Sequence, residues 1–340
     1  MAQANPKIDL TNLALQVTLT EGASISPDPS KVMDYSQTRK FTVTSQDGNW
    51  HKEYSVIIDT FDLPFQYDFE HYELNETGKY QVFFEETQGT ALFKQYIWAS
   101  GNSGFALTGV GRNPQEYPTV SIENGIDGSR AIKLETKSTG QFGETVKMPI
   151  AAGNLFLGSF DVNNAVQKPL KATLFGLPFG KKPLKFKGYY KYVPGTQSFK
   201  AKDKNGNTVT ISRQEDEGDI YAVLYEAAGL DGKVLDGNNV LTSKNIVALA
   251  RVEVEKTDRY IEFETSFQYG ERKEISWPQF IYRDPSDDGT GEYLSFSEEK
   301  MKNYEYNLAV VFTSSKYGAY FAGSVGSTLC IDKVEIVCEK

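Results

Sequence analysis

The stretch Lys185-Phe186-Lys187-Gly188-Tyr189-Tyr190-Lys191-Tyr192, followed by Val193-Pro194-Gly195, predicts one long β-strand with two different faces. Alternation across a strand places Phe186, Gly188, Tyr190 and Tyr192 on one face, and Lys185, Lys187, Tyr189 and Lys191 on the other. The first face is apolar enough to pack on a core. The second places an aromatic ring among lysines, which suits a polar ligand with a flat apolar side, such as a sugar. The Pro-Gly pair ends the strand, because proline removes a ladder donor and glycine permits a turn.

The bulk composition favours an all-β protein with two domains. A length of 340 residues is more than one compact domain usually holds, and we place the domains at 1–62 and 63–340. A content of 13% aromatic residues with 29 Gly is typical of strands joined by many turns. The net charge of −9 argues against nucleic acid or an anionic membrane as the partner. The sequence contains no apolar run long enough for a transmembrane helix.

Residues 8–60 predict a small β-sandwich. Residues 13–19 alternate apolar and polar side chains, residues 41–44 and 54–58 also favour strands, and Asp47-Gly48 is a strong turn signal. With Gly22-Ala23-Ser24-Ile25-Ser26-Pro27 and Asp34-Tyr35-Ser36, this pattern resembles an immunoglobulin-like module. That module lies near the N-terminus of exported glycan-handling proteins of the Bacteroidetes. The resemblance implies a spacer without a binding site of its own.

Residues 63–340 predict a larger antiparallel jelly roll. The runs 220–225, 246–250 and 308–312 are apolar enough to be central strands, and 260–267 alternates. Only Ser297 to Lys302 favours a short helical turn. Many strands without crossover helices indicate a β-sandwich rather than an α/β fold.

The same region also resembles the carbohydrate metabolism domain family of the Bacteroidetes. The motifs that carry the resemblance lie at 98–102, 151–158, 188–192, 220–225, 314–321 and 323–329. The resemblance implies a jelly roll similar to carbohydrate-binding modules, in a protein exported to the periplasm or cell surface. It also implies a lipid anchor in the full-length form, although residues 1–6 show neither a signal peptide nor an anchoring cysteine.

A sugar offers an apolar face and a ring of hydroxyls, so its site needs an aromatic platform beside hydrogen-bonding groups. Two pairs of residues meet that description: Trp98 with Asn102, and Tyr189 with Lys191. Ser315 and Lys316 follow a central strand and offer a hydroxyl and an ammonium for the rim of a pocket. The competing interpretation is that Trp98 belongs to the core, that Tyr189 covers an exposed sheet, and that Ser315 lies in a tight connection.

Catalysis by carboxylates is the alternative function. Glu262 and Glu264 lie two residues apart on one strand face, roughly 6.5–7 Å from each other, and glycoside hydrolysis needs about 5 to 9.5 Å. Glu226 could join them if its strand is adjacent. An ordinary solvated strand shows the same pattern, so no catalytic residue is assigned. A third possibility is a structural component of a glycan-uptake assembly with no sugar site.

Few residues in the sequence suit a metal or a cofactor. The histidines are His51 and His71, and neither a C-x-x-C pair nor an H-E-x-x-H motif is present, so we expect no zinc. A structural calcium would need Asp68 and Glu70 to meet Asp332 through pairing of the first and last strands. The segment 284–289 fails the EF-hand pattern.

Cys330 and Cys338 lie on one expected strand, too far apart to bond to each other.

From the sequence as a whole we expect a monomer that binds an oligosaccharide or polysaccharide without cleaving it. Its protein partners would be other outer-membrane components of glycan uptake.

Overall fold

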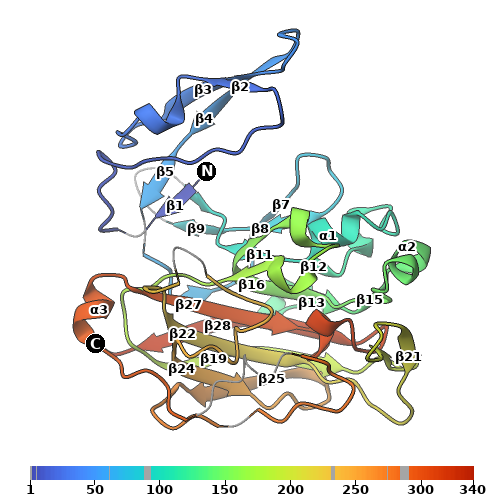
Figure 1. Cartoon of the computed structure of the whole chain (residues 1–340). Helices are drawn as coiled ribbons and strands as arrows, with labels where there is room; N and C mark the ends of the chain where they lie inside the picture. Colours follow the sequence, from blue (N-terminus) through green and yellow to red (C-terminus); the bar gives the residue numbers. More distant parts are fainter. Residues whose placement is uncertain are drawn as a thin grey trace. The chain divides into compact units, whose positions relative to one another are not determined.

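The computed structural model describes residues 2–4, 6–60, 62–87, 93–230, 234–273, 275–283 and 291–340. The chain divides into two compact units: residues 1–63 together with 178–180, and the remaining residues from 64 to 340. Both units consist mainly of β-strands joined by turns, as the composition predicts (Figure 1). Within the described part of the chain, no helix combines the length and the apolarity needed to cross a membrane.

The first unit holds two small sheets. Its antiparallel sheet contains β2 (Ser24–Ser26), β3 (Arg39–Thr44) and β4 (His51–Val56), and β1 (Ala2–Ala4) pairs in parallel with β5 (Ile58–Thr60). Buried Tyr35, Phe41 and Ile58 form the core of this unit.

The alternating segment 13–19 differs from the prediction, because it is not a strand. Leu13 and Leu15 pack against the core, but the backbone N–H of Leu13 donates to the carbonyl of Met33 at 2.7 Å. The alternation therefore marks side chains that face inward at Leu13 and Leu15, but Val17 is exposed and the segment forms no strand ladder.

The second unit is a sandwich of two sheets. The larger sheet has nine strands in the order β23 (Leu235–Asp236), β17 (Thr173–Phe175), β16 (Asn154–Phe160), β27 (Tyr306–Thr313), β22 (Asp219–Glu226), β24 (Ile246–Val252) and β26 (Gln268–Tyr269), with β11 (Trp98–Ala99) on β16 and β18 (Leu177–Pro178) on β27. The smaller sheet has six strands in the order β12 (Thr119–Ile122), β13 (Ala131–Glu135), β28 (Thr328–Cys338), β19 (Pro183–Val193) and β25 (Thr257–Ser266), with β6 (Gln66–Tyr67) also on β28.

Short elements surround these sheets. Four described hairpins pair β7 (Tyr72–Leu74) with β8 (Gln81–Phe83), β9 (Glu85–Thr87) with β10 (Phe93–Gln95), β14 (Lys137–Ser138) with β15 (Ile150–Ala151), and β20 (Lys200–Lys202) with β21 (Thr208–Thr210). The described α-helices are α1 (Asn102–Ala106), α2 (Gly140–Thr145) and α3 (Glu298–Lys302). Helix α3 confirms the expected turn and begins after Ser297, whose side chain caps it. Helices α1 and α2 were not expected.

Aromatic rings fill the space between the two sheets. Phe312 of β27 lies 6.1 Å from Phe186 of β19 and 6.2 Å from Trp98 of β11, measured between ring centroids. The predicted inward face of β19 is confirmed, because Phe186, Gly188, Tyr190 and Tyr192 are all buried. The first and last strands of the unit do pair, which is the condition set above for a calcium site, since Tyr67 of β6 lies opposite Val334 of β28.

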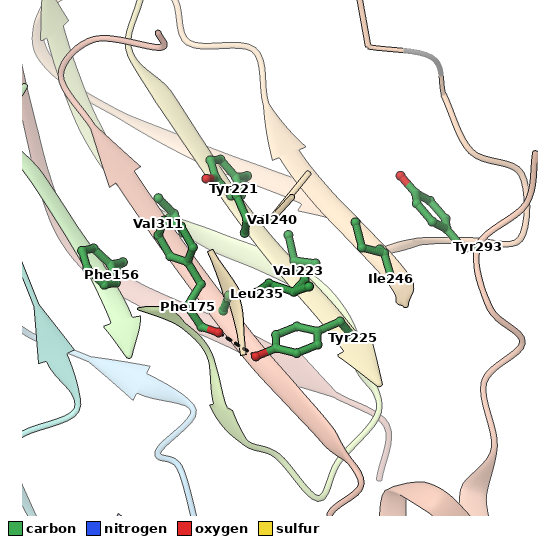
Figure 2. Close-up of a cluster of buried hydrophobic side chains, with 11 residues drawn as sticks. Phe156, Phe175, Tyr221, Val223, Tyr225, Leu235, Val240, Ile246, Tyr293 and Val311 are labelled. Atoms are coloured by element: carbon green, nitrogen blue, oxygen red, sulfur yellow. Dashed lines mark hydrogen bonds between the residues drawn. The ribbon is translucent and has the colours of Figure 1, made fainter. Parts of the chain in front are cut away.

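The larger sheet is buried on both faces near its centre, which explains the apolar runs of β22 and β27. A second apolar cluster covers the face turned away from the smaller sheet (Figure 2). It contains Phe156, Phe175, Tyr221, Val223, Tyr225, Leu235, Val240, Ile246, Tyr293, Ala309 and Val311. The hydroxyl of Tyr225 donates to the carbonyl of Phe175 at 2.6 Å and ties β22 to the edge strand β17 (Figure 2).

Candidate functional site

The outer face of the larger sheet opens into a cavity of about 200 Å³ near Asp219 and Thr313, which lie opposite each other in β22 and β27. We call it the outer groove. Its floor comes from the sheet and its walls come from loops. The lining residues used below are Phe142, Asn154, Phe160, Asp219, Tyr221, Trp277, Thr313, Lys316 and Tyr320.

Aromatic rings form one wall of the outer groove. Trp277 meets Tyr320 edge to face, with ring centroids 5.9 Å apart, and the guanidinium of Arg283 lies 4.6 Å from the Trp277 ring centroid. These contacts fix the orientation of the indole. Among the described residues, the buried Nε1 of Trp277 has no hydrogen-bond partner. The wall therefore offers a positioned aromatic surface beside an unused donor.

A charged pair lies at the edge of the floor. Arg251 of β24 donates from Nε to Oδ1 of Asp219 at 2.9 Å and from Nη2 to Oδ2 at 2.6 Å. This fork-to-fork geometry holds the carboxylate in a fixed plane. Burial raises the pKa of the neighbouring Tyr221, so its hydroxyl stays protonated and can donate a hydrogen bond.

A buried polar cluster supports the loop behind this groove. Asp216 accepts hydrogen bonds from the Ser315 hydroxyl at 2.6 Å, the Ser327 hydroxyl at 2.7 Å and the Ser324 backbone N–H at 2.7 Å. Burial raises the pKa of Asp216, and these three donors act in the opposite direction. The cluster joins the segment after β27 to the loop that precedes β22.

A second cavity, of about 540 Å³, lies between the hairpin of β9 and β10 and the smaller sheet; we call it the polar pocket. Its lining is Pro64, Gln66, Tyr67, Asp68, His71, Glu85, Glu86, Gln95, Lys187, Gly188, Tyr189, Glu262, Lys333, Val334 and Glu335. Glu85 is only 7% exposed and accepts a hydrogen bond from Nε1 of Trp98 at 2.8 Å. Burial raises the pKa of Glu85 to about 8, and the nearby charge of Asp68 adds to this effect.

Comparison with known proteins identifies the family of the larger unit. The family model described as "Putative carbohydrate metabolism domain" matches residues 68–337, which is most of the chain. The chain belongs to this carbohydrate metabolism domain family. A second family model, described as "SGBP, N-terminal", matches residues 2–58. No curated protein matches the chain.

Two solved structures from Bacteroides are similar to this family member, and each is described as a "putative glycoside hydrolase". The protein from Bacteroides thetaiotaomicron is 40% identical, with a TM-score of 0.78 over 99% of this chain and 89% of that chain. The protein from Bacteroides vulgatus is 34% identical, with a TM-score of 0.65 over 82% of this chain and 100% of that chain.

In this family member, three of the six expected binding residues are buried. Trp98 is 4% exposed, and Asn102 and Ser315 are fully buried. Asn102 bonds through both ends of its amide to the backbone of Thr119, at 2.8 and 3.1 Å. The expectation that these side chains present a surface to a sugar is therefore corrected. Trp98 and Asn102 hold the fold together, whereas Ser315 is a fully buried part of the lining of the outer groove.

The other three expected residues are partly exposed and lie in different places. Lys316 lines the outer groove, and its Nζ lies 2.7 Å from Glu217. Tyr189 lines the polar pocket. Lys191 lies outside both cavities, with Nζ 5.0 Å from the ring centroid of Tyr260. A binding role for these three residues stays a prediction, and the structure does not bring them into one site.

The carboxylates considered for hydrolysis are also separated. Glu226 belongs to β22 in the larger sheet and pairs with Lys300 at 2.7 Å, whereas Glu262 and Glu264 belong to β25 in the smaller sheet. Hydrogen bonds from Lys185 and Lys187 lower the pKa of Glu264, so it stays ionised. The expectation that Glu226 joins the other two is therefore corrected. Glu262 lines the polar pocket, whereas Glu226 and Glu264 line neither of the two cavities described above.

The carboxylates suggested for calcium have separate hydrogen-bond partners. Asp332 accepts from the backbone N–H of Ile126 at 2.7 Å and from the Ser129 hydroxyl at 2.8 Å, and Glu70 accepts from the backbone N–H of Arg130 at 2.9 Å. Over the described ranges, no group of three His, Cys, Asp or Glu side chains is arranged for a metal. The segment 284–289 lies outside the described residues.

Several residues of the two cavities were missed by the sequence analysis. Asp219 and Arg251 flank the apolar runs of β22 and β24, and a charge beside a buried run was an available signal. Trp277 lies in a segment without strand or helix, and nothing in the sequence places it beside Tyr320. Glu85 follows two phenylalanines, and the sequence around it predicts only an ordinary residue of a strand.

Proposed function

We propose that this protein binds a glycan in the outer groove without cleaving it. The observation that carries the proposal is an aromatic wall in the same cavity as Asp219, whose carboxylate is held in place by Arg251 behind it. Trp277 and Tyr320 offer ring surfaces to the C–H face of a sugar, and the carboxylate of Asp219 lies beside them for its hydroxyls.

The number of carboxylates that line the groove favours binding over hydrolysis. Among its described lining residues, Asp219 is the one carboxylate, and both of its oxygens already accept from Arg251. Hydrolysis of a glycosidic bond usually needs two carboxyl groups, one of them free to give or take a proton. The groove therefore lacks a pair of this kind within the part of the lining that is described.

Membership of the carbohydrate metabolism domain family supports a carbohydrate as the class of ligand, without specifying the sugar. The ligand we propose is an oligosaccharide or polysaccharide. The resemblance of the first unit to modules of exported proteins supports a site of action outside the cytoplasm, beside other glycan-uptake proteins. Hydrolysis remains the competing function, since both similar structures are described as glycoside hydrolases.

A glycan-array screen with product analysis tests this proposal. Trp277→Ala should weaken binding by about tenfold or more, because one aromatic platform contributes on the order of 1.4 kcal/mol. The matched control is Trp50→Ala, which removes a 51% exposed tryptophan from the first unit and should bind as the parent does.

Glycan recovered intact after binding, with loss of binding in the Trp277 variant alone, is the expected result. Shortened products released by the parent protein would establish an enzyme and overturn the proposal. Binding that is equal in the parent and in both variants would show that the ligand lies outside the outer groove.

A further inference from the structure

The polar pocket contains more hydrogen-bonding capacity than the protein itself uses. Among the described residues, neither Oη of Tyr67 nor Oε1 of Gln95 has a hydrogen-bond partner, although these side chains are only 1% and 4% exposed. Buried polar atoms are nearly always satisfied, and a pair left open in one cavity marks a place for a ligand or an ordered water.

Glu85 completes this inner wall. In the hairpin of β9 and β10 it lies directly opposite Gln95, and cross-strand neighbours of this kind present their side chains on the same face. One carboxyl oxygen accepts from the indole of Trp98. The ring of Trp98 in turn packs edge to face on Tyr67, with centroids 5.1 Å apart. Two of the three deeply buried polar side chains, Glu85 and Tyr67, are therefore in contact with one tryptophan, and Gln95 lies beside Glu85.

An irregularity in the smaller sheet lies at the opposite side of the pocket. The register between β19 and β28 shifts after Lys187, so two residues of β28 face one residue of β19. Lys333 takes a left-handed backbone conformation there, with φ of 46°. Bulges of this kind re-aim side chains and are frequent beside binding sites. The neighbouring Tyr189 and Glu262 lie opposite each other at the rim.

The charges around the pocket define which ligand group it suits. Its lining carries five carboxyl groups, namely Asp68, Glu85, Glu86, Glu262 and Glu335. Burial raises the pKa of Glu85 to about 8, so this group keeps its proton in the empty pocket near neutral pH and ionises when a cation binds beside it. The two lining lysines are already paired with carboxylates outside the pocket, Lys187 with Glu264 and Lys333 with Asp127, each at 2.9 Å. His71 lies 3.8 Å from Glu86. The surplus is in acceptors and negative charge, so a complementary group must be rich in donors and positive.

We propose that the polar pocket binds a protonated primary amine, with its three N–H donors directed to Glu85, Gln95 and Tyr67. The inner acceptors match the number of donors on an ammonium group. A volume of about 540 Å³ leaves room for a ring-sized body behind the amine, with Tyr189 at the rim to contact it. The ligand class is a small amine-bearing molecule, such as an unacetylated amino sugar.

This inference does not rest on the proposed function, because the outer groove and the polar pocket share no lining residue. The tryptophans of the chain make the two sites separable in one experiment. The sequence has three: Trp98 lies beside the pocket, Trp277 lines the groove, and Trp50 is exposed in the first unit.

The test is a titration of the ¹⁵N-labelled full chain, followed through the three indole N–H signals in a transverse-relaxation-optimised NMR spectrum. Single Trp→Phe variants assign the signals. Glucosamine and n-propylammonium should each shift the Trp98 signal saturably and leave Trp50 unmoved. N-acetylglucosamine, which lacks the ammonium, should leave Trp98 unmoved.

Two pocket variants and one control test whether the pocket side chains cause the response of Trp98. Glu85→Gln and Gln95→Leu should each weaken the response of Trp98 by about tenfold, since a hydrogen bond to a charged group is lost. Gln95→Leu keeps the bond between Glu85 and Trp98, so it tests the pocket even if Glu85→Gln folds poorly. Glu298→Gln removes an exposed carboxylate on α3 and should titrate as the parent does.

Three results would overturn the inference. If neither amine shifts Trp98, the pocket is not a ligand site. If N-acetylglucosamine shifts the Trp98 signal equally, the pocket recognises hydroxyl groups and not an ammonium. If the amines shift Trp277 and leave Trp98 unmoved, they bind in the outer groove, and the proposal for the polar pocket fails while the proposed function stands.

Discussion

The buried carboxyl of Glu85 accepts a 2.8 Å hydrogen bond from the indole nitrogen of Trp98, and this bond joins the wall of a polar cavity to the aromatic core between the sheets. A titratable group therefore lies next to side chains that stabilise the whole unit. Because folding buries this carboxyl, its protonation state and the stability of the fold are linked.

The first prediction follows from that linkage. The pKa of Glu85 rises from an ordinary value of 4.5 to about 8, so folded protein holds the proton through this pH range while unfolded protein releases it. Stability should fall as pH rises from about 4.5 to 8, by up to roughly 5 kcal/mol from this group. Glu85→Gln should flatten the dependence, and urea unfolding at pH 5 and pH 9 measures it. Parallel profiles in the parent and the variant would contradict the assignment.

The ion pair at the outer groove leads to a second prediction. Asp219→Asn leaves the Arg251 guanidinium partly buried without its carboxylate, which should destabilise the unit by roughly 3 kcal/mol. The matched control is Glu53→Gln, which breaks an exposed pair with Lys40 and should change stability by less than about 1 kcal/mol. Thermal unfolding measured at one salt concentration gives both values. An Asp219 variant as stable as the control would show that the pair contributes little.

Gly188 permits close packing inside the sandwich, and its replacement is the third prediction. A Cβ at this position would lie 2.8 Å from the Phe263 ring and 3.0 Å from a methyl of Val334. Gly188→Ala should therefore destabilise the larger unit by roughly 1–3 kcal/mol. Adding Phe263→Leu should recover part of the loss, because the smaller side chain makes room. Chemical denaturation of the parent, the two single variants and the double variant measures the four free energies of unfolding. If the losses of the two single variants simply add in the double variant, the clash is not the cause.

The fourth prediction concerns the thiols. Burial raises the pKa of Cys330 and of Cys338 to about 11, so neither is appreciably ionised at pH 8. A maleimide should therefore react slowly with folded protein and rapidly once urea unfolds it. Cys338 should react before Cys330, because Cys330 is only 2% exposed. Cys338→Ser isolates the slower thiol, and fast labelling of that variant at pH 8 would contradict the burial.

The sequence predicts the strands of the larger unit well where one physical signal dominates. The alternation around Tyr190 separates the core face of β19 from its other face, and the apolar runs locate β22 and β27. Helices α1 and α2 are five and six residues long, too short for a helical period to be recognised.

The candidate sites could be predicted only in part, because their residues come together through tertiary structure. The sequence analysis chose Trp98 as a sugar platform and missed Trp277, yet Trp98 is packed between the sheets and Trp277 lines a groove. The difference depends on neighbours such as Phe312 and Tyr320, which are distant along the chain. Likewise, the pKa of Glu85 depends on burial that no local pattern reveals.

The position of β28 constrains the order in which the larger unit can be completed during synthesis. This strand is the last of the unit along the chain, yet it lies in the middle of the smaller sheet between β13 and β19. Until residues 328–338 leave the ribosome, β13 and β19 each present an open edge to other chains. The sheets of the first unit come from residues 2–60, so they can form much earlier.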